Sequence, residues 1–238
     1  MYNPYSGYAT AAQAQESLSL QSYVAKVMRR VFGKMFLGLL ITAITSLMVV
    51  SSEAMLSFIF SSRIVFFGLI IAELGLVFAI SGAINKLSST TATLLFYLYA
   101  VINGLTLSSI FLIYSASAIT LTFAITSITF GTMALLGYIT RKDLSKMGGI
   151  LFMALIGLIV ATIVNIFLPS SALDWIISFA GVVIFTGLTA WDTQKIKNMA
   201  SMTDPSQAGK VATLGALSLY LDFINLFLYL LRFLGRNN

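Results

Sequence analysis

The chain has 238 residues, of which 58% are hydrophobic and 9% are charged, and its mean hydropathy is +0.95. This is too few charged side chains to cover the surface of a soluble protein of this size. The composition therefore predicts a polytopic membrane protein. The sequence contains no cysteine and no histidine, which excludes disulfides, haem ligation and the usual zinc sites. Carboxylates remain as the strong metal ligands, and they favour hard cations. The net charge of +6 does not indicate nucleic acid, because the basic residues lie between hydrophobic segments.

Residues 1–20 have no basic start followed by an apolar core, so they do not resemble a secretory signal. We expect a flexible, mildly polar tail here, and then a short amphipathic helix at the membrane surface over 21–34. The rest of the chain, 21–238, should form one membrane domain. It holds seven segments long and apolar enough to cross a bilayer, at about 34–51, 64–84, 92–114, 118–140, 147–168, 175–194 and 212–234.

The basic residues are distributed unevenly between the connections of these segments. If the amino terminus is cytoplasmic, then of the 14 basic residues only Arg63, Arg232 and Arg236 fall on the outer side. Lysine and arginine prefer the cytoplasmic side of a membrane, so this pattern predicts a cytoplasmic amino terminus and an external carboxyl terminus.

Asp222 lies near the centre of the last predicted span, where a charge costs about 3 kcal/mol or more unless it is paired, hydrated or protonated. Gly215, Ser218, Asn225 and Tyr229 follow at spacings of three and four, which places them on the same helix face. We therefore predict that Asp222 belongs to a polar network directed toward other helices.

Two further acids admit a structural interpretation beside a functional one. Asp192 lies near the cytoplasmic end of the sixth span, where it can reach water and pair with Lys195. Glu73 lies about halfway along the second span and can be a protonated carboxyl that bonds inside the bundle, to Asn103 or to a backbone carbonyl. The sequence leaves both interpretations open.

Two long motifs resemble the Bax inhibitor family, the transmembrane Bax-inhibitor-motif proteins, and most closely its bacterial inner-membrane branch. They are TGLTAWDTQKIK at 186–197 and ALSLYLDFINLFLYLLRF at 216–233, supported by AELGLV at 72–77, GLTLSSIF at 104–111 and KDLSKMG at 142–148. The resemblance runs through most of 21–236. It implies an all-α membrane protein of seven transmembrane helices, the last one central and surrounded by the other six, in a bacterial inner membrane.

The resemblance also implies pH-sensitive passage of calcium down its gradient, controlled by two aspartates that match Asp192 and Asp222. In relatives of known structure, an arginine at the cytoplasmic end of the second helix contacts the sixth-helix aspartate. Here that place reads Ala83-Ile84-Asn85-Lys86. Lys86 could replace the arginine, but an ammonium group cannot make its planar two-pronged contact.

Two carboxylates within hydrogen-bond distance in a low-dielectric bundle should share one proton, which gives a pH sensor without histidine. Once ionised, the pair would bind calcium transiently, so protons and calcium compete for it. We expect no cofactor, with calcium as the permeating ion, and no enzymatic activity. The residues expected around the pair or along the path are Glu73, Lys86, Asn103, Ser218 and Asn225.

The pair can meet only if the sixth helix extends inward past Lys197, the seventh begins later than Ala212, or the helices tilt. We expect the sixth helix to extend past Lys197, because residues 194–199 contain no helix breaker.

Three other functions compete with the channel. An intramembrane aspartyl protease would carry a motif like Gly-x-Gly-Asp, but 219–222 reads Leu-Tyr-Leu-Asp, and a retinal protein would need a lysine within the last helix. The stronger rival is a regulator that binds another membrane protein. Some bacterial relatives are associated with a membrane-anchored ATP-dependent protease, which could grip residues 1–20. The expected partners are thus membrane lipids, calcium and protons, with such a protease as the alternative.

Overall fold

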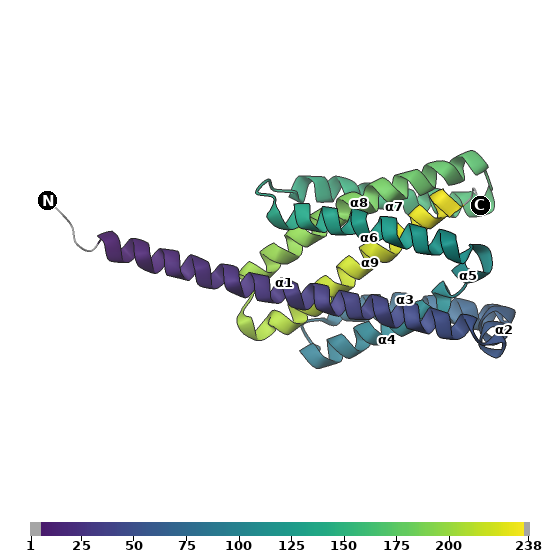
Figure 1. Cartoon of the computed structure of the whole chain (residues 1–238), viewed down its shortest axis with the longest axis horizontal. Helices are drawn as coiled ribbons and strands as arrows, with labels where there is room; N and C mark the ends of the chain where they lie inside the picture. Colours follow the sequence, from purple (N-terminus) through teal and green to yellow (C-terminus); the bar gives the residue numbers. More distant parts are fainter. Residues whose placement is uncertain (1–5, 236–238) are drawn as a thin grey trace.

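The computed structural model describes residues 6–235, with side chains described at 13 and 15–235, and this part of the chain is helical without a strand. Figure 1 shows the elements as a bundle of roughly antiparallel helices. They are α1 (Ser6–Val50), α2 (Glu53–Ser61), α3 (Arg63–Ala83), α4 (Ser89–Leu107), α5 (Ile110–Ile113), α6 (Ala116–Ile139), α7 (Ser145–Phe167), α8 (Ser171–Met202), the 3-10 helix η1 (Pro205–Gln207) and α9 (Ala208–Leu234).

Seven of the described segments are long and apolar enough to cross a membrane, which confirms the predicted number of spans. The third span combines α4 with the short helix α5. Helix α2 was not predicted, and it lies between the first and second spans. Ser52 begins it and Ser62 ends it, and each serine hydroxyl caps the helix that follows by accepting a backbone N–H.

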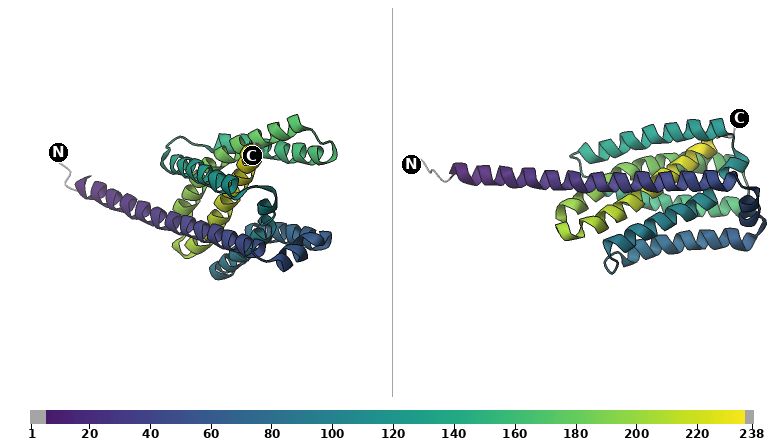
Figure 2. Two further views of the ribbon diagram at one scale, coloured as in Figure 1. Left: turned by 45° about the vertical axis from the view of Figure 1, so that its right-hand side comes forward. Right: turned by 60° about the horizontal axis from the view of Figure 1, so that its bottom comes forward.

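Helix α1 differs from the expected tail and separate surface helix. It runs without interruption from Ser6 into the first span, and it projects beyond the bundle (Figures 1 and 2). Between Gly7 and Gly33 the chain has no glycine or proline, and its first part is rich in alanine, glutamine and leucine, which are strong helix formers. Residues 1–5 of the predicted tail lie outside the described part.

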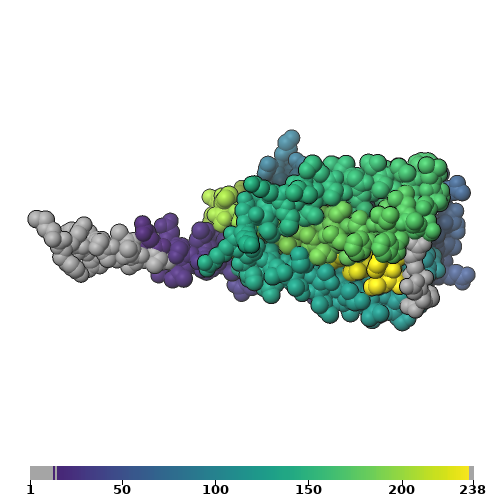
Figure 3. Space-filling view, turned by 90° about the horizontal axis from the view of Figure 1, so that it is seen from above, coloured from purple at the N-terminus to yellow at the C-terminus, as the bar shows by residue number. Residues whose placement is uncertain are grey.

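The last helix, α9, is the centre of the bundle, as predicted. Within its most apolar stretch 67% of residues are buried, compared with 6% in α3 and in α7. It packs against α8, α1, α6 and α4, and the space-filling view of Figure 3 shows its carboxyl-terminal part at the surface. Aromatic rings fasten it to its neighbours. Phe223 meets Phe130 of α6 edge to face at 5.4 Å, and Tyr220 meets Phe96 of α4 at 5.6 Å.

Glycines bring α8 into close contact with α6, α7 and α9. A Cβ atom on Gly137 would overlap the backbone of Ala190, and one on Gly148 would overlap the Trp191 indole. On the α9 side, a Cβ on Gly215 would lie 2.8 Å from the Ile196 side chain. Glycine therefore lets all three helices approach the segment of α8 that carries Asp192.

Not every glycine within a span has this role. Gly131 and Gly157 also lie within spans. A Cβ at either position would meet nothing within 4 Å, so these two glycines do not mark close helix contacts.

We expect Gly137→Leu to destabilise the protein by about 2–3 kcal/mol, because the new side chain must push α6 away from α8. In a protein of this size that corresponds to a fall in the melting temperature of roughly 5 °C or more. Thermal unfolding of the purified protein in detergent measures it. Gly157→Leu makes the same change in open space and is the matched control. Equal melting temperatures for the two variants would contradict the assigned packing.

Candidate functional site

Asp192 of α8 and Asp222 of α9 lie at similar depths in the bundle. Helix α8 continues to Met202, which confirms the prediction that it extends past Lys197. At about 1.5 Å per residue, Asp192 lies roughly 15 Å from that end of α8, and Asp222 roughly 21 Å from the first residue of α9. The inward extension of α8 therefore reduces the difference in depth between the two acids to roughly 6 Å.

The two carboxyl groups lie within hydrogen-bonding range of each other. Asp222 is buried, and Asp192 is partly buried. Oδ2 of Asp222 has no hydrogen-bond partner among the described residues. An ionised carboxylate only accepts hydrogen bonds, so two ionised groups leave this oxygen without a donor. One proton held between the two carboxyls would supply it.

The cation nearest to the pair is Lys195, whose charge acts on both carboxyls. Its Nζ lies 4.7 Å from the ring centroid of Trp191, and among the described side chains it forms no contact ion pair with Asp192. Lys86 is exposed in the turn between α3 and α4, and no described contact joins it to Asp192. The arginine contact known in relatives thus has no counterpart at Lys86 in this structure.

Polar contacts hold the segment of α8 beside the pair. Oε1 of Gln194 accepts from the backbone N–H of Leu144 at 2.8 Å, and its Nε2 donates to the carbonyl of Lys142 at 2.8 Å. Nζ of Lys197 donates to the carbonyl of Tyr138 at 2.7 Å. The α6–α7 connection is thereby fixed to α8. The sequence analysis assigned no role to Gln194, and the only signal was a neutral amide within the 186–197 motif.

A second polar network lies on another side of α9. Glu73 accepts from the Thr106 hydroxyl at 2.6 Å and from Nδ2 of Asn103 at 3.3 Å. Oδ1 of Asn103 accepts from the Tyr220 hydroxyl at 2.8 Å, and this hydroxyl lies 2.6 Å from that of Thr42 on α1. The network therefore joins α3, α4, α9 and α1, and of the two partners considered for Glu73 it contains Asn103.

This network does not adjoin the aspartate pair. Tyr220 and Asp222 are two residues apart on α9 and so point to different sides of the helix. No described hydrogen bond joins Glu73 or Asn103 to either aspartate.

The other predicted members of the stripe are more loosely connected. Nδ2 of Asn225 donates to the carbonyl of Leu221 on its own helix at 2.8 Å, and Ser218 is partly buried without a described side-chain hydrogen bond to the pair. The structure thus brings Asp192 and Asp222 together, and it does not gather Glu73, Lys86, Asn103, Ser218 and Asn225 around them.

From the sequence, Lys34 counts only among the basic residues that orient the chain in the membrane. In the structure its ammonium group lies between α1, α4 and α9. It donates to the hydroxyls of Thr93 on α4 and Thr213 on α9, at 2.7 and 2.6 Å, and to the carbonyl of Gly209 at 3.5 Å. Three neutral acceptors thus match its three donors. This contact holds the first turns of α9 against α1 and α4.

In the part of the chain that the structure describes, no third carboxylate joins Asp192 and Asp222 in a cluster. No group of three or more acidic side chains that could hold a metal ion occurs among the described residues. Calcium takes six to eight oxygen ligands, so two carboxylates alone form an incomplete site. Such a pair suits a passing cation better than a resident one.

Comparison with known proteins agrees with this architecture. The family model described as "Inhibitor of apoptosis-promoting Bax1" matches residues 24–238. The chain is 49% identical to "Inner membrane protein YbhL" of Escherichia coli over 224 residues, covering 93% of this chain and 94% of that protein. A protein of Borreliella burgdorferi is 50% identical over 226 residues, covering 94% and 96%, and a membrane protein of Streptococcus pyogenes is 35% identical over 226 residues, with the same coverage. With this match and seven helices long and apolar enough to span a membrane, the last of them central, the chain belongs to the Bax inhibitor family of membrane proteins.

Proposed function

We propose that this protein is a pH-sensitive calcium leak channel in which Asp192 and Asp222 bind both the proton and the permeating ion. The contact between their carboxyl groups, with Oδ2 of Asp222 lacking a donor, is the observation that carries the proposal. When the pair holds a proton, the two groups bond to each other and the site is closed to cations. When the proton leaves, two adjacent negative charges remain, and a divalent cation neutralises them.

The change in protonation of the pair would act at the interface between α8 and α9. Gly215 and Ile196 hold the two helices in close contact there. Two ionised carboxylates repel each other and attract water, which opens this contact to a hydrated ion. Gln194 binds α8 to the α6–α7 connection, and Lys197 binds it to Tyr138 at the end of α6. A movement of α8 would therefore either carry these segments with it or be restrained by them.

The membrane potential supplies the driving force. Moving one charge across 100 mV is worth about 2.3 kcal/mol, so a divalent cation that crosses the full field gains about 4–5 kcal/mol. No other energy source and no enzymatic step is needed. We place the protein in a bacterial inner membrane with a cytoplasmic amino terminus and an external carboxyl terminus, and the Escherichia coli relative supports the inner membrane.

We expect calcium flux through the full-length protein in liposomes to change with pH, and Asp222→Asn to remove that dependence, because an amide does not titrate. Loss of the carboxylate ligand should also lower the flux at high pH by about tenfold, equivalent to about 1.4 kcal/mol. A calcium-sensitive dye inside the vesicles measures the initial rate from pH 5 to 8. Asp192→Asn should behave in the same way.

Asp143→Asn is the matched control for this experiment. Asp143 is exposed in the α6–α7 connection, where the hydrogen bond from Ser145 holds the pKa of its carboxyl below the usual range. Its removal should leave the rate and its pH dependence unchanged. An unchanged flux in the double variant of Asp192 and Asp222 would refute the channel proposal.

A second function, binding to a membrane-anchored ATP-dependent protease, is favoured by the projecting part of α1. This part continues as a helix beyond the bundle, and Leu18 and Leu20 of α1 are 59% and 45% exposed. Leu20 lies beside α6 and α8, so these leucines mark the place where α1 leaves the bundle, and they provide an apolar surface that a partner could cover.

We expect deletion of residues 1–20 to change the turnover of that protease's substrates in cells, while calcium flux in liposomes stays as in the full chain. A double variant, Leu18→Ser with Leu20→Ser, should reproduce the effect without shortening the chain. Protease turnover that is the same for all three proteins would exclude this second function. Absence of flux at every pH, together with altered turnover, would favour it over the channel.

A further inference from the structure

Helices α1 and α6 form an open seam along one side of the bundle. The close contacts of α1 are with α4, α9 and α8, and those of α6 are with α8 and α9. Between α1 and α6 lies a groove of about 600 Å³, lined mainly by apolar side chains. These include Met28, Phe32 and Phe36 of α1, and Phe130 and Leu135 of α6.

The groove opens toward the membrane. Phe36 and Leu135, on its two sides, are 67% and 58% exposed in a segment that spans the bilayer. Gly131 contributes no side chain, and a Cβ atom there would meet nothing within 4 Å. An apolar groove that faces lipid is not filled by water, because water gains no hydrogen bonds there.

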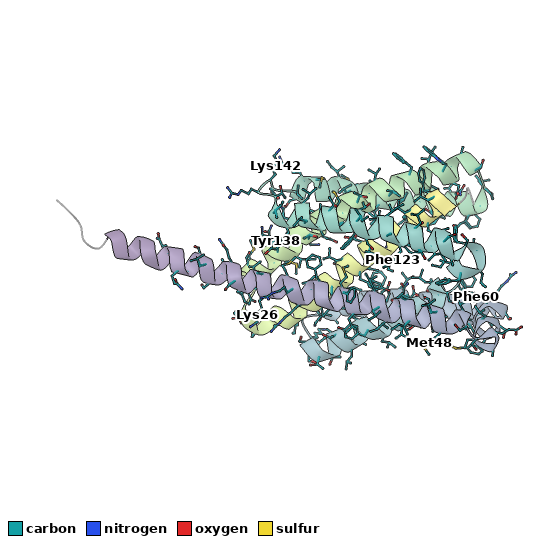
Figure 4. All side chains as sticks on the ribbon, in the orientation of Figure 1. Lys26, Met48, Phe60, Phe123, Tyr138 and Lys142 are labelled. Atoms are coloured by element: carbon teal, nitrogen blue, oxygen red, sulfur yellow. The ribbon has the colours of Figure 1, made fainter. Side chains whose placement is uncertain are left out.

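One end of the groove is positively charged. Arg29 lines it there, is exposed, and has no hydrogen bond or ion pair among the described side chains. Tyr138, at the same end, has Nζ of Lys197 5.1 Å from its ring centroid. Figure 4 shows Tyr138 at the end of the bundle from which α1 projects, the end that also carries Lys26 and Lys142.

We propose that this groove binds one anionic phospholipid, with an acyl chain along Phe36 and Leu135 and the phosphate on Arg29. A guanidinium group makes two parallel hydrogen bonds to phosphate oxygens, and basic pockets between membrane helices suit anionic headgroups. The occupant must be apolar along most of its length and negative at one end. A phospholipid of the adjacent leaflet has this chemistry, and the membrane supplies it directly.

Through Phe130, the groove is linked to the helix that carries Asp222. Phe130 lines the groove, and its ring lies 5.4 Å from that of Phe223 on α9. An acyl chain in the groove therefore packs against the aromatic contact that fastens α6 to α9. The binding itself does not depend on calcium passage and can be tested separately.

The test is native mass spectrometry of the full-length protein, titrated with phosphatidylglycerol or with phosphatidylcholine of the same acyl chains. We expect tighter binding of phosphatidylglycerol. Arg29→Gln should weaken it about fivefold, the value of one basic residue near a membrane surface. Arg30→Gln is the matched control, because Arg30 is also exposed and does not line the groove. It should leave the preference unchanged.

A second pair of variants tests the apolar part. Gly131→Leu adds a side chain in the open groove and should weaken binding of both lipids, whereas Gly157→Leu adds the same side chain on α7 and should not. Melting temperatures confirm that each variant is folded. Equal effects of Arg29→Gln and Arg30→Gln would indicate a diffuse basic surface and overturn the proposal. So would undiminished binding in Gly131→Leu, or equal affinity of the two lipids.

Discussion

Burial of the Asp222 carboxyl against Asp192 is the constraint on which the rest of the bundle depends. A lone ionised carboxylate inside a membrane protein is unstable, and a second one beside it adds repulsion unless a proton or a cation lies between them. The helix that carries Asp222 is therefore the one that other helices enclose, because the pair must be kept from acyl chains. The central position of α9 and the site on it are consequences of the same requirement.

Helix α8 provides the other half of the site, and small residues determine its position. Gly137, Gly148 and Gly215 belong to three different helices, and each allows a close approach to the stretch of α8 around Asp192. The side chain of Gln194 then links this stretch to the α6–α7 connection. Under the proposed function, a change at the pair would reach the surface through these contacts, because packed helices move by discrete steps.

The polar groups of α9 fall into separate systems with different chemistry. Toward α1 and α4, Tyr220 and Thr213 take part in hydrogen bonds whose donors and acceptors are matched, including the ammonium of Lys34. Toward α8, Asp222 keeps an oxygen without a donor. The polar groups of the central helix are thus paired on one side and incompletely paired on the other, and the proposed function assigns the proton and the ion to the incompletely paired side.

The sequence by itself determined the membrane class and the seven spans, because hydrophobic length is a local property. A position near mid-membrane depth also singled out Asp222 as a candidate, whereas Asp192 became one through the family resemblance. The sequence also predicted that α8 continues past Lys197, since no helix breaker follows. It could not decide which polar residues meet. Asn103 bonds to Glu73 and to Tyr220 and not to the pair, and α1 includes most of the expected tail, because these outcomes depend on how helices rotate and pack. Only the tertiary structure could show that Oδ2 of Asp222 lacks a donor, since that depends on every helix around it.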